Sequence, residues 1–272
     1  MTTLKQTYWK ARDFVFWKFI VRLQWFAFNK NKILKGNHHE KFSIGIVTYI
    51  SRYDSFFKKL IVQLTRIFPD MEIIVIVNGY YDLEAQKNYL EKISAFLNQF
   101  PNVKYVSYHE PQGLSKLWNN IITNASHEHV FILNDDIIIS PSLRKELIQM
   151  PKNTLTLINN SWSHFLIAKK TVQEIGTFDE RFIEIGNEDQ DYEFRLIAQN
   201  HRTETILINK IKSVVEQPLD FSYGKNMKTV NKKYSLANWN FLNKKWDIST
   251  EKKENYLYSS KFNIWFNPTP KL

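Results

Sequence analysis

The sequence predicts an α/β fold with a mostly parallel central sheet flanked by helices, and three observations support this prediction. Apolar runs that are typical of buried strands occur at residues 42–49, 72–77 and 130–139, and a shorter strand is expected at 102–108. Helical spacing of apolar residues occurs between them, at residues 51–68, 83–100 and 113–125. Strands that alternate with helices are typical of βαβ units, in which successive strands run parallel.

The run at residues 130–139, VFILNDDIII, organises the rest of the chain. We expect one buried strand that presents Asp135 and Asp136 at its carboxyl end. Ligands of open α/β sheets bind beyond the carboxyl ends of the strands. Two adjacent carboxylates favour a cation partner, and a divalent metal that carries a phosphorylated ligand would supply it. The alternative is an Asp-rich turn that only ends the strand.

Polar residues at the ends of the first two strands are expected at the same edge. Thr48 and Tyr49 close the first strand, and Asn78 closes the second. A hydroxyl, a phenol and an amide can hydrogen-bond to, or stack on, a base and a ribose. Capping of the strand ends is the alternative interpretation for each.

A second acidic group follows Gly186 and consists of Glu188, Asp189 and Asp191. Arg195 lies four residues after Asp191, which is the spacing of a helical ion pair. Acids at a helix N-terminus are stabilised by the helix dipole, so an acidic capping turn explains one or two of them. A carboxylate placed there, near a sugar hydroxyl, can instead act as a general base.

Composition limits the class of protein. The 272 residues include no cysteine, so disulfides and thiolate metal sites are excluded. The net charge of +10 is concentrated at the ends, because residues 1–41 and 221–272 each carry +7 and residues 42–220 carry −4. A nucleic-acid reader more often carries positive charge on its folded body, so we expect no nucleic-acid partner. Basic, aromatic-rich ends indicate an anionic membrane surface or another anionic partner.

Three regions follow from this pattern: an amphipathic basic extension (1–41), a catalytic domain (42–220), and a C-terminal loop with a helical, aromatic extension (221–272). Residues 13–28 are too short and too charged to span a bilayer. They could lie in a membrane interface, with Trp9, Trp17 and Trp25 at headgroup depth. Packing on the main domain or on another copy of the chain is the alternative.

Taken together, several segments resemble the inverting family 2 glycosyltransferases, which have a GT-A fold. The resemblance covers about residues 42–202. It rests on SIGIVTY-ISRYD, EIIVIVNGY, GLSKLWNNII with Asn119 in register, FILNDDI in place of the DXD strand end, and GTFDERF followed by NEDQDYEFR.

The resemblance implies a role for each matching residue. Asp136 would bind the divalent cation, Mn²⁺ or Mg²⁺, that bridges the nucleotide diphosphate, and Asp189 would be the general base. Glu188 and Asp191 fall on the acceptor side, where Asp191 with Arg195 would also hold the loop. The nucleotide-binding positions are Thr48, Tyr49, Arg52, Asn78, Gly113, Lys116, Asn134 and Asp135.

Three departures from the family pattern weaken this transfer of roles. Asn134 stands where the DXD triplet has its first Asp, and Val77 stands where the second strand often ends in Asp. No histidine follows His201, although many relatives place a late histidine near the metal; Glu216 or Gln217 would have to replace it.

The expected function is transfer of a sugar from a nucleotide-diphosphate donor, with UDP the commonest nucleotide, to a saccharide or lipid-linked acceptor. The resemblance implies surface polysaccharide biosynthesis, such as capsule or lipopolysaccharide. We expect a cytoplasmic protein at the inner face of the membrane, with peripheral contact through the N-terminal segment. The departures keep one alternative open: a catalytically inactive GT-A-like binding subunit of a glycan-assembly complex.

Overall fold

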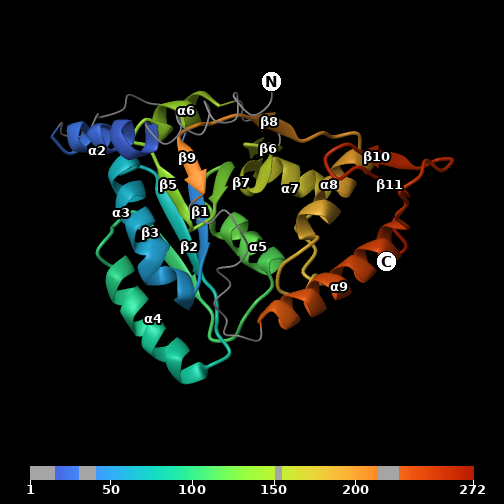
Figure 1. The fold of residues 1–272 in the computed structure, drawn as a ribbon, viewed down its shortest axis with the longest axis horizontal. Helices are drawn as coiled ribbons and strands as arrows, with labels where there is room; N and C mark the ends of the chain where they lie inside the picture. The colour runs from blue at the N-terminus through green and yellow to red at the C-terminus, as the bar shows by residue number, and fades with distance from the viewer. Residues whose placement is uncertain (1–15, 31–40, 151–154, 214–226) are drawn as a thin grey trace.

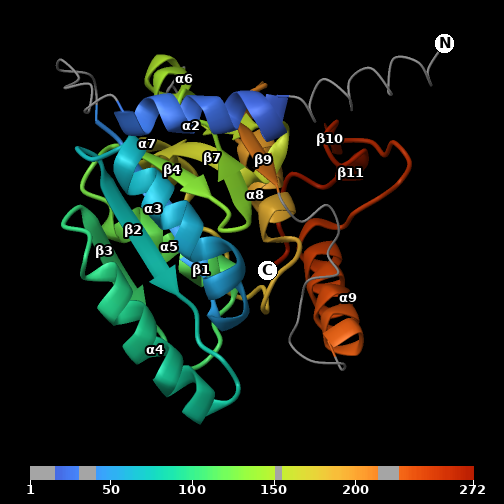
Figure 2. The same cartoon turned by 60° about the vertical axis from the view of Figure 1, so that its left-hand side comes forward.

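The computed structural model describes residues 16–30, 41–150, 155–213 and 227–272. Its centre is a seven-stranded sheet in the order β3-β2-β1-β4-β7-β6-β8 (Figures 1 and 2). In this sheet β7 alone runs antiparallel to its neighbours. The strands are β1 (Ser43–Thr48), β2 (Glu72–Val77), β3 (Val103–Ser107), β4 (His129–Leu133), β6 (Leu155–Ile158), β7 (Ser161–Ala168) and β8 (Glu204–Ile206). The predicted α/β fold with a mostly parallel sheet and flanking helices is therefore confirmed.

Helices cover both faces of this sheet, because the apolar side chains of its strands point in both directions. One face packs on α3 (Lys58–Ile67) and α4 (Leu83–Leu97), and the other on α5 (Leu114–Asn124), α7 (Lys169–Ile175) and α8 (Glu188–Ala198). Alternate residues of β2 show the division, since Ile73 and Val75 join the first core and Ile74 and Ile76 the second. The short helices η2 (Ile50–Arg52) and η3 (Tyr53–Phe57) lead from β1 into α3.

The apolar run at residues 130–139 is not one strand, which corrects the prediction. Strand β4 ends at Leu133, and residues 134–136 turn away from the sheet. The remaining apolar residues form β5 (Ile137–Ile139), which pairs antiparallel with β9 (Ile211–Ser213) outside the main sheet. The apolar run breaks in two because its second half pairs with β9, about 70 residues later in the chain. Asp135 and Asp136 therefore lie in a turn between β4 and β5. Helix α6 (Leu143–Gln149) follows.

The C-terminal region forms a long helix and a hairpin on the body of the molecule. Helix α9 (Met227–Trp246) is followed by the antiparallel strands β10 (Leu257–Ser259) and β11 (Ile264–Phe266). Leu242 and Trp246 of α9 pack with Phe194 of α8 in a third apolar cluster. The helix expected within residues 221–272 is thus present, and it begins at Met227. Glu216, Gln217 and Trp9 lie outside the described residues.

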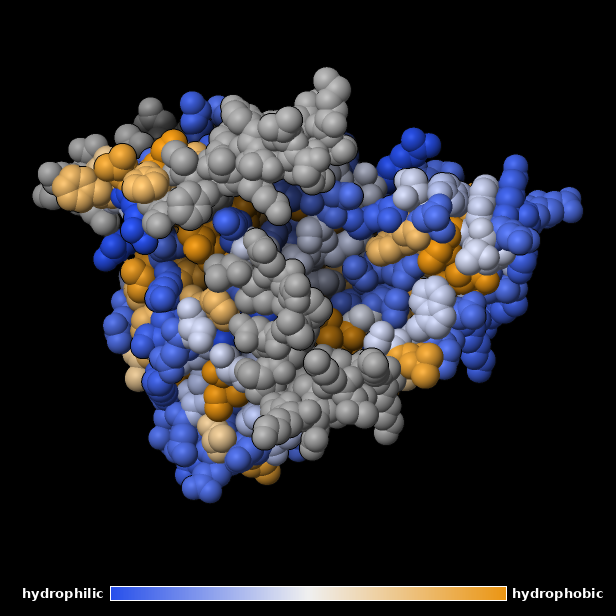
Figure 3. Space-filling view, in the orientation of Figure 1, coloured by the Kyte–Doolittle hydropathy of each residue, from blue (hydrophilic) through white to orange (hydrophobic). Residues whose placement is uncertain are grey.

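The N-terminal helix lies across the top of the molecule in Figure 2, above α3 and beside α6. It consists of η1 (Phe16–Ile20) and α2 (Val21–Lys30). Val21 is buried, and the indole nitrogen of Trp25 donates to the carbonyl oxygen of Ile139 at 3.2 Å. Its opposite side adds an apolar patch to the surface at the upper left of Figure 3. Within the described part of the chain, no helix has both the length and the hydropathy needed to cross a bilayer.

Candidate active site

The carboxyl ends of β1 to β4 lie at one edge of the sheet, because these four strands are parallel and in register. Strand β7 begins at the same edge, since His164 pairs with Leu133 at the end of β4. The predicted positions Thr48, Asn78 and Asp135 therefore share this edge. It is the place where open α/β sheets bind their ligands.

Asp135 and Asp136 are both buried, with 4% and 6% of their surface exposed, and Arg52 pairs with both. Its Nη1 lies 3.1 Å from Oδ1 of Asp135 and 2.5 Å from Oδ2 of Asp136. The Nε of Arg52 donates to the hydroxyl of Tyr49 at 3.0 Å, which orients the guanidinium. Both carboxylates thus form ion pairs with the same guanidinium group, that of Arg52, which the hydroxyl of Tyr49 holds in place.

One oxygen of each carboxylate remains available. Among the described residues, Oδ2 of Asp135 and Oδ1 of Asp136 are buried and have no hydrogen-bond partner. Burial raises the pKa of Asp135 to about 6, although Arg52 and Thr48 favour its ionised form. Buried polar atoms without partners cost free energy, so these two oxygens indicate a place for a ligand.

These residues fit a divalent cation. Carboxylate oxygens are the ligands that Mg²⁺ and Mn²⁺ prefer, and Mg²⁺ is commonly held by one or two carboxylates together with substrate phosphates. No group of three or more His, Asp and Glu side chains in the described residues converges in a ligating geometry, so phosphate oxygens would have to complete the coordination.

His164 lies beside this acidic pair and was not identified from the sequence. It is 4% exposed, and its Nδ1 accepts a long hydrogen bond from the backbone nitrogen of Asn134 at 3.4 Å. Burial lowers the pKa of His164 to about 4, although the charge of Asp136 opposes this shift. The imidazole is therefore neutral at pH 7, which is the form that can accept a hydrogen bond or a metal. The sequence feature that could have identified His164 is its position as a single histidine within the largely apolar segment SWSHFLIA.

Three of the predicted nucleotide-binding residues, Asn78, Gly113 and Lys116, lie around the loop that precedes α5. The amide oxygen of Asn78 accepts from the backbone nitrogens of Gly79 and Gln112, both at 2.9 Å. Lys116 donates to the side chain of Gln112 at 2.8 Å. The amide of Asn78 therefore shapes this loop.

The second acidic group lies at the start of α8. Gly186 and Asn187 adopt left-handed backbone angles, with φ of +123° and +70°, and turn the chain into the helix. Glu188 is buried and accepts from the nitrogen of Gly186 at 2.6 Å, whereas Asp189 is partly exposed. Burial and the neighbouring Asp189 raise the pKa of Glu188 to about 8, and burial also raises the pKa of Asp189. Asp189 is thus the acid of this pair that a substrate can reach.

Asp191 is not located where a residue that contacts the acceptor, as predicted from the sequence, would have to be. It is fully buried, and its oxygens accept from Trp246 at 2.7 Å, contact Lys245 at 2.6 Å and pair with Arg195 at 3.1 Å. Both oxygens of its carboxylate are therefore engaged, one with α9 and the other with Arg195 of α8. The predicted pairing with Arg195 is present, and contact with an acceptor is not compatible with this burial.

Two asparagines hold the loop at residues 177–187, which carries the second acidic group. Asn119 on α5 accepts from the nitrogen of Phe178 and donates to its carbonyl oxygen, both at 2.9 Å. Asn238 on α9 accepts from the nitrogen of Ile183 at 2.8 Å and donates to the carbonyl oxygens of Ile183 and Gly186 at 2.7 and 2.9 Å. Each amide pairs with the backbone as a neighbouring strand would.

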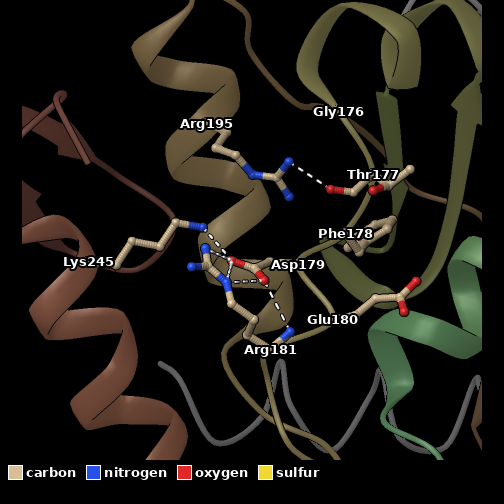
Figure 4. Close-up of a pocket in the computed structure, with 8 residues that line it drawn as sticks. All are labelled: Gly176, Thr177, Phe178, Asp179, Glu180, Arg181, Arg195 and Lys245. Atoms are coloured by element: carbon tan, nitrogen blue, oxygen red, sulfur yellow. Dashed lines mark hydrogen bonds and ion pairs between the residues drawn. The ribbon is translucent and has the colours of Figure 1, made fainter. Parts of the chain in front are cut away.

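An open cavity of about 400 Å³ lies beside the first part of this loop (Figure 4). Lys245 and Arg181 point toward Asp179 across it, with contacts of 2.8 and 2.7 Å, while Arg195 points to Thr177. The residues that line it include neither of the two acidic pairs. We therefore interpret it as the space around an ion-pair network that joins the loop to α8 and α9.

Contacts between neighbouring residues link the turn that carries the first acidic pair, Asp135 and Asp136, to helix α8, which begins with the second pair, Glu188 and Asp189. The nitrogen of Asn134 donates to the carbonyl oxygen of Ser163 at 3.1 Å, and the adjacent Trp162 packs on Tyr192 of α8 with ring centroids 6.1 Å apart. A Cβ at Gly113 would approach the carbonyl oxygen of Phe182 to 2.9 Å. The loop that leads to Glu188 therefore packs closely on the start of α5.

A comparison with protein families finds one match. Residues 43–157 match the model of the family described as Glycosyl transferase family 2. The match covers less than half of the chain; it includes Asp135 and Asp136 and ends before α8. No curated protein matches the chain.

Solved structures with a similar fold include a mannosyltransferase. The mannosyltransferase PcManGT from Pyrobaculum calidifontis, in complex with GDP-Man and Mn²⁺, is 11% identical, with a TM-score of 0.50 over 73% of this chain and 66% of that chain. GalNAc-T7 with UDP, GalNAc and Mn²⁺ is 10% identical, with a TM-score of 0.51 over 76% and 49%. S. aureus TarS 1–349 is 16% identical, with a TM-score of 0.47 over 61% and 58%. The chain thus spans between about half and two thirds of these proteins. The likeness to the first two concerns the fold.

Proposed function

We propose that the protein is an inverting glycosyltransferase, which moves a sugar from a nucleotide-diphosphate donor to a saccharide or lipid-linked acceptor. The observation that carries this proposal is the pair Asp135 and Asp136 just beyond the carboxyl edge of a mostly parallel sheet, with a second acidic pair at the start of α8, whose preceding loop packs on Gly113. The first pair has two buried oxygens without partners, and the second has one reachable carboxylate. The family match at residues 43–157 supports the same reaction class.

The donor would lie along the edge formed by β1, β2 and the start of α5. Thr48, Tyr49, Asn78, Gly113, Lys116 and Asn134 surround the place of the base and ribose, and UDP is the expected nucleotide. Asp136, with Asp135, would hold Mn²⁺ or Mg²⁺ against the diphosphate. When bound, the cation neutralises charge that develops on the departing diphosphate.

The acceptor would approach from α8. Asp189 takes the proton of the acceptor hydroxyl, and that oxygen forms a bond to the anomeric carbon. The bond between this carbon and the diphosphate oxygen breaks, so the nucleoside diphosphate leaves with the electron pair and the configuration inverts. A raised pKa makes Asp189 a stronger base than an ordinary aspartate, and Glu188 at its side is uncharged at neutral pH. Glu188 is buried and would position the acceptor only indirectly, through Asp189 and through the loop that its carboxylate holds at Gly186, whereas Asp191 holds α8 to α9.

The acceptor class that we propose is the lipid-linked or growing saccharide of a surface glycan such as capsule or lipopolysaccharide. Work at the inner face of the cytoplasmic membrane would bring the protein to such acceptors. The support is the apolar outer side of α2 together with the basic ends of the chain.

The second candidate is a catalytically inactive GT-A-like binding subunit of a glycan-assembly complex. It is favoured by Asn134 and Val77, which replace acids of the family pattern. An inactive subunit would bind nucleotides or glycans and would leave the sugar–phosphate bond intact.

One assay separates these candidates. The purified chain is incubated with a panel of nucleotide sugars and Mn²⁺, and release of nucleoside diphosphate is measured with and without a chelator. Release that requires the metal and is lost in Asp136→Asn supports the transferase. Binding of nucleotides without release from any donor, even with added glycan acceptors, would favour the binding subunit.

A further inference from the structure

Helix α2 has two different faces, and only one of them contacts the body. On the inner face, Val21 is 3% exposed, and Gln24 accepts from the hydroxyl of Ser140 at 2.6 Å. Leu23 and Phe26 on the outer side of α2 are 66% and 60% exposed, and Phe19 of the preceding η1 is 55% exposed. The helix is therefore fixed to the protein in a way that presents large apolar side chains to the outside.

A basic groove lies between this helix and α3. Its apolar wall contains Trp25, Val62 and Phe96, and its charged residues are Lys58, Lys59 and Arg66. The volume is about 420 Å³, and no acid is among the described residues that line it. Asp54, which pairs with Lys58 at 3.4 Å, lies outside the lining. Such a groove is suited to an anion that carries an apolar body.

We propose that the α2–α3 groove binds the phosphate headgroup of an anionic phospholipid while the outer side of α2 enters the membrane interface. The two features adjoin on one helix, because Trp25 lines the groove and Leu23 and Phe26 face outward. An amphipathic helix with cations beside an apolar face is the usual arrangement for interfacial binding. A second copy of this chain is a poorer occupant, since it would bring its own cations to the same groove.

This arrangement sets the position of the membrane relative to the active site. Trp25 donates to Ile139, which is three residues after Asp136 in the chain. The membrane surface would therefore lie close to the strand that continues from the acidic pair. That position suits an acceptor that is itself held in the membrane, but the groove binds lipid whether or not the proposed transfer occurs.

The test is flotation of the full chain with vesicles of phosphatidylcholine, with and without phosphatidylglycerol, in the absence of sugar substrates. We expect binding to the anionic vesicles only. A lysine near such a surface contributes about a five-fold factor, so the double variant Lys58→Ala/Lys59→Ala should bind about 10- to 25-fold more weakly. The matched control Lys87→Ala/Lys170→Ala, which removes two exposed lysines elsewhere, should change binding less than about two-fold.

The apolar part is tested separately with Leu23→Ser/Phe26→Ser, which should abolish flotation and leave the thermal unfolding temperature unchanged, because both side chains are exposed. Equal losses in the groove variant and its control would overturn the headgroup site. Displacement by millimolar inorganic phosphate would assign the groove to a free anion instead. A dimer in sedimentation analysis that is lost in Leu23→Ser/Phe26→Ser would assign the outer side to self-association. Release of nucleoside diphosphate should be the same in all these variants, so failure here is distinguishable from failure of the proposed reaction.

Discussion

Replacing Arg52 by Gln should destabilise the protein without metal and increase the stabilisation that a divalent cation provides. Arg52 has 12% of its side chain exposed, and its carboxylate partners have 6% and 9%. Removing one partner of such a buried ion pair costs about 3–5 kcal/mol, because the remaining charges are left without compensation. One kcal/mol shifts the unfolding temperature of a domain of this size by about 2–4 °C. We therefore expect a decrease of about 6 °C or more.

A divalent cation should reverse much of this loss. At a free concentration 100 times its dissociation constant, a ligand adds about 2.7 kcal/mol to stability. In the natural protein part of that gain is offset, since the cation has to displace Arg52 from the carboxylates or share them with it. The measurement is thermal unfolding followed by fluorescence, with and without Mn²⁺.

Arg144→Gln is the matched control. Arg144 makes two contacts to Asp70, at 2.6 and 2.8 Å, but 44% of the Asp70 side chain is exposed. Exposed ion pairs contribute about 0–1 kcal/mol, so this variant should lose little stability and should not respond to Mn²⁺ differently from the natural protein. Equal losses in both variants, or an equal response to Mn²⁺, would refute the view that Arg52 compensates an acidic cation site.

Three further predictions concern the second acidic group. Asp189→Asn should lower the transfer rate by about 10²–10⁴-fold, while calorimetry finds unchanged nucleotide binding; a normal rate would exclude Asp189 as the base. Asn238→Ala removes three hydrogen bonds to residues 183–186 and should lower the free energy of unfolding by about 2–3 kcal/mol in denaturant titrations, whereas the exposed Asn240→Ala should not. Burial and the neighbouring Asp189 raise the pKa of Glu188 to about 8, so the folded protein keeps a proton that the unfolded chain loses near pH 4.5. The free energy of unfolding should therefore decrease as the pH rises from about 4.5 to 8. Glu188→Gln should therefore be more stable than the natural protein at pH 8 and differ less at pH 5; the opposite order would contradict a protonated Glu188.

The parallel half of the sheet was predictable from the sequence, because each of its strands is either a continuous apolar run or follows a helix with clear periodicity. The antiparallel strand β7 was missed, since Ser161, Ser163 and His164 interrupt its apolar pattern. The break after Leu133 was also missed, because three isoleucines continue the apolar run beyond it. Their true partner is β9, and no local pattern reveals a pairing across more than 70 residues.

The candidate site likewise has features that could be predicted from the sequence and features that could not. The two acidic pairs were identified from their residue types and from the segments that precede them. The burial of Asp191 could not be foreseen, because it depends on Lys245 and Trp246, more than 50 residues later. The same holds for Asn238, whose role depends on a loop that it meets only in the folded chain.

The amides of Asn119 and Asn238 have one more consequence. Each amide hydrogen-bonds to the backbone in the way that a peptide group does. The loop at residues 177–187 is therefore fixed to α5 and α9 by hydrogen bonds like those that hold an edge strand, although it is not part of a sheet. A truncation between residues 199 and 237 should then disable the proposed reaction, although Asp136, Glu188 and Asp189 are all still present in the shortened chain.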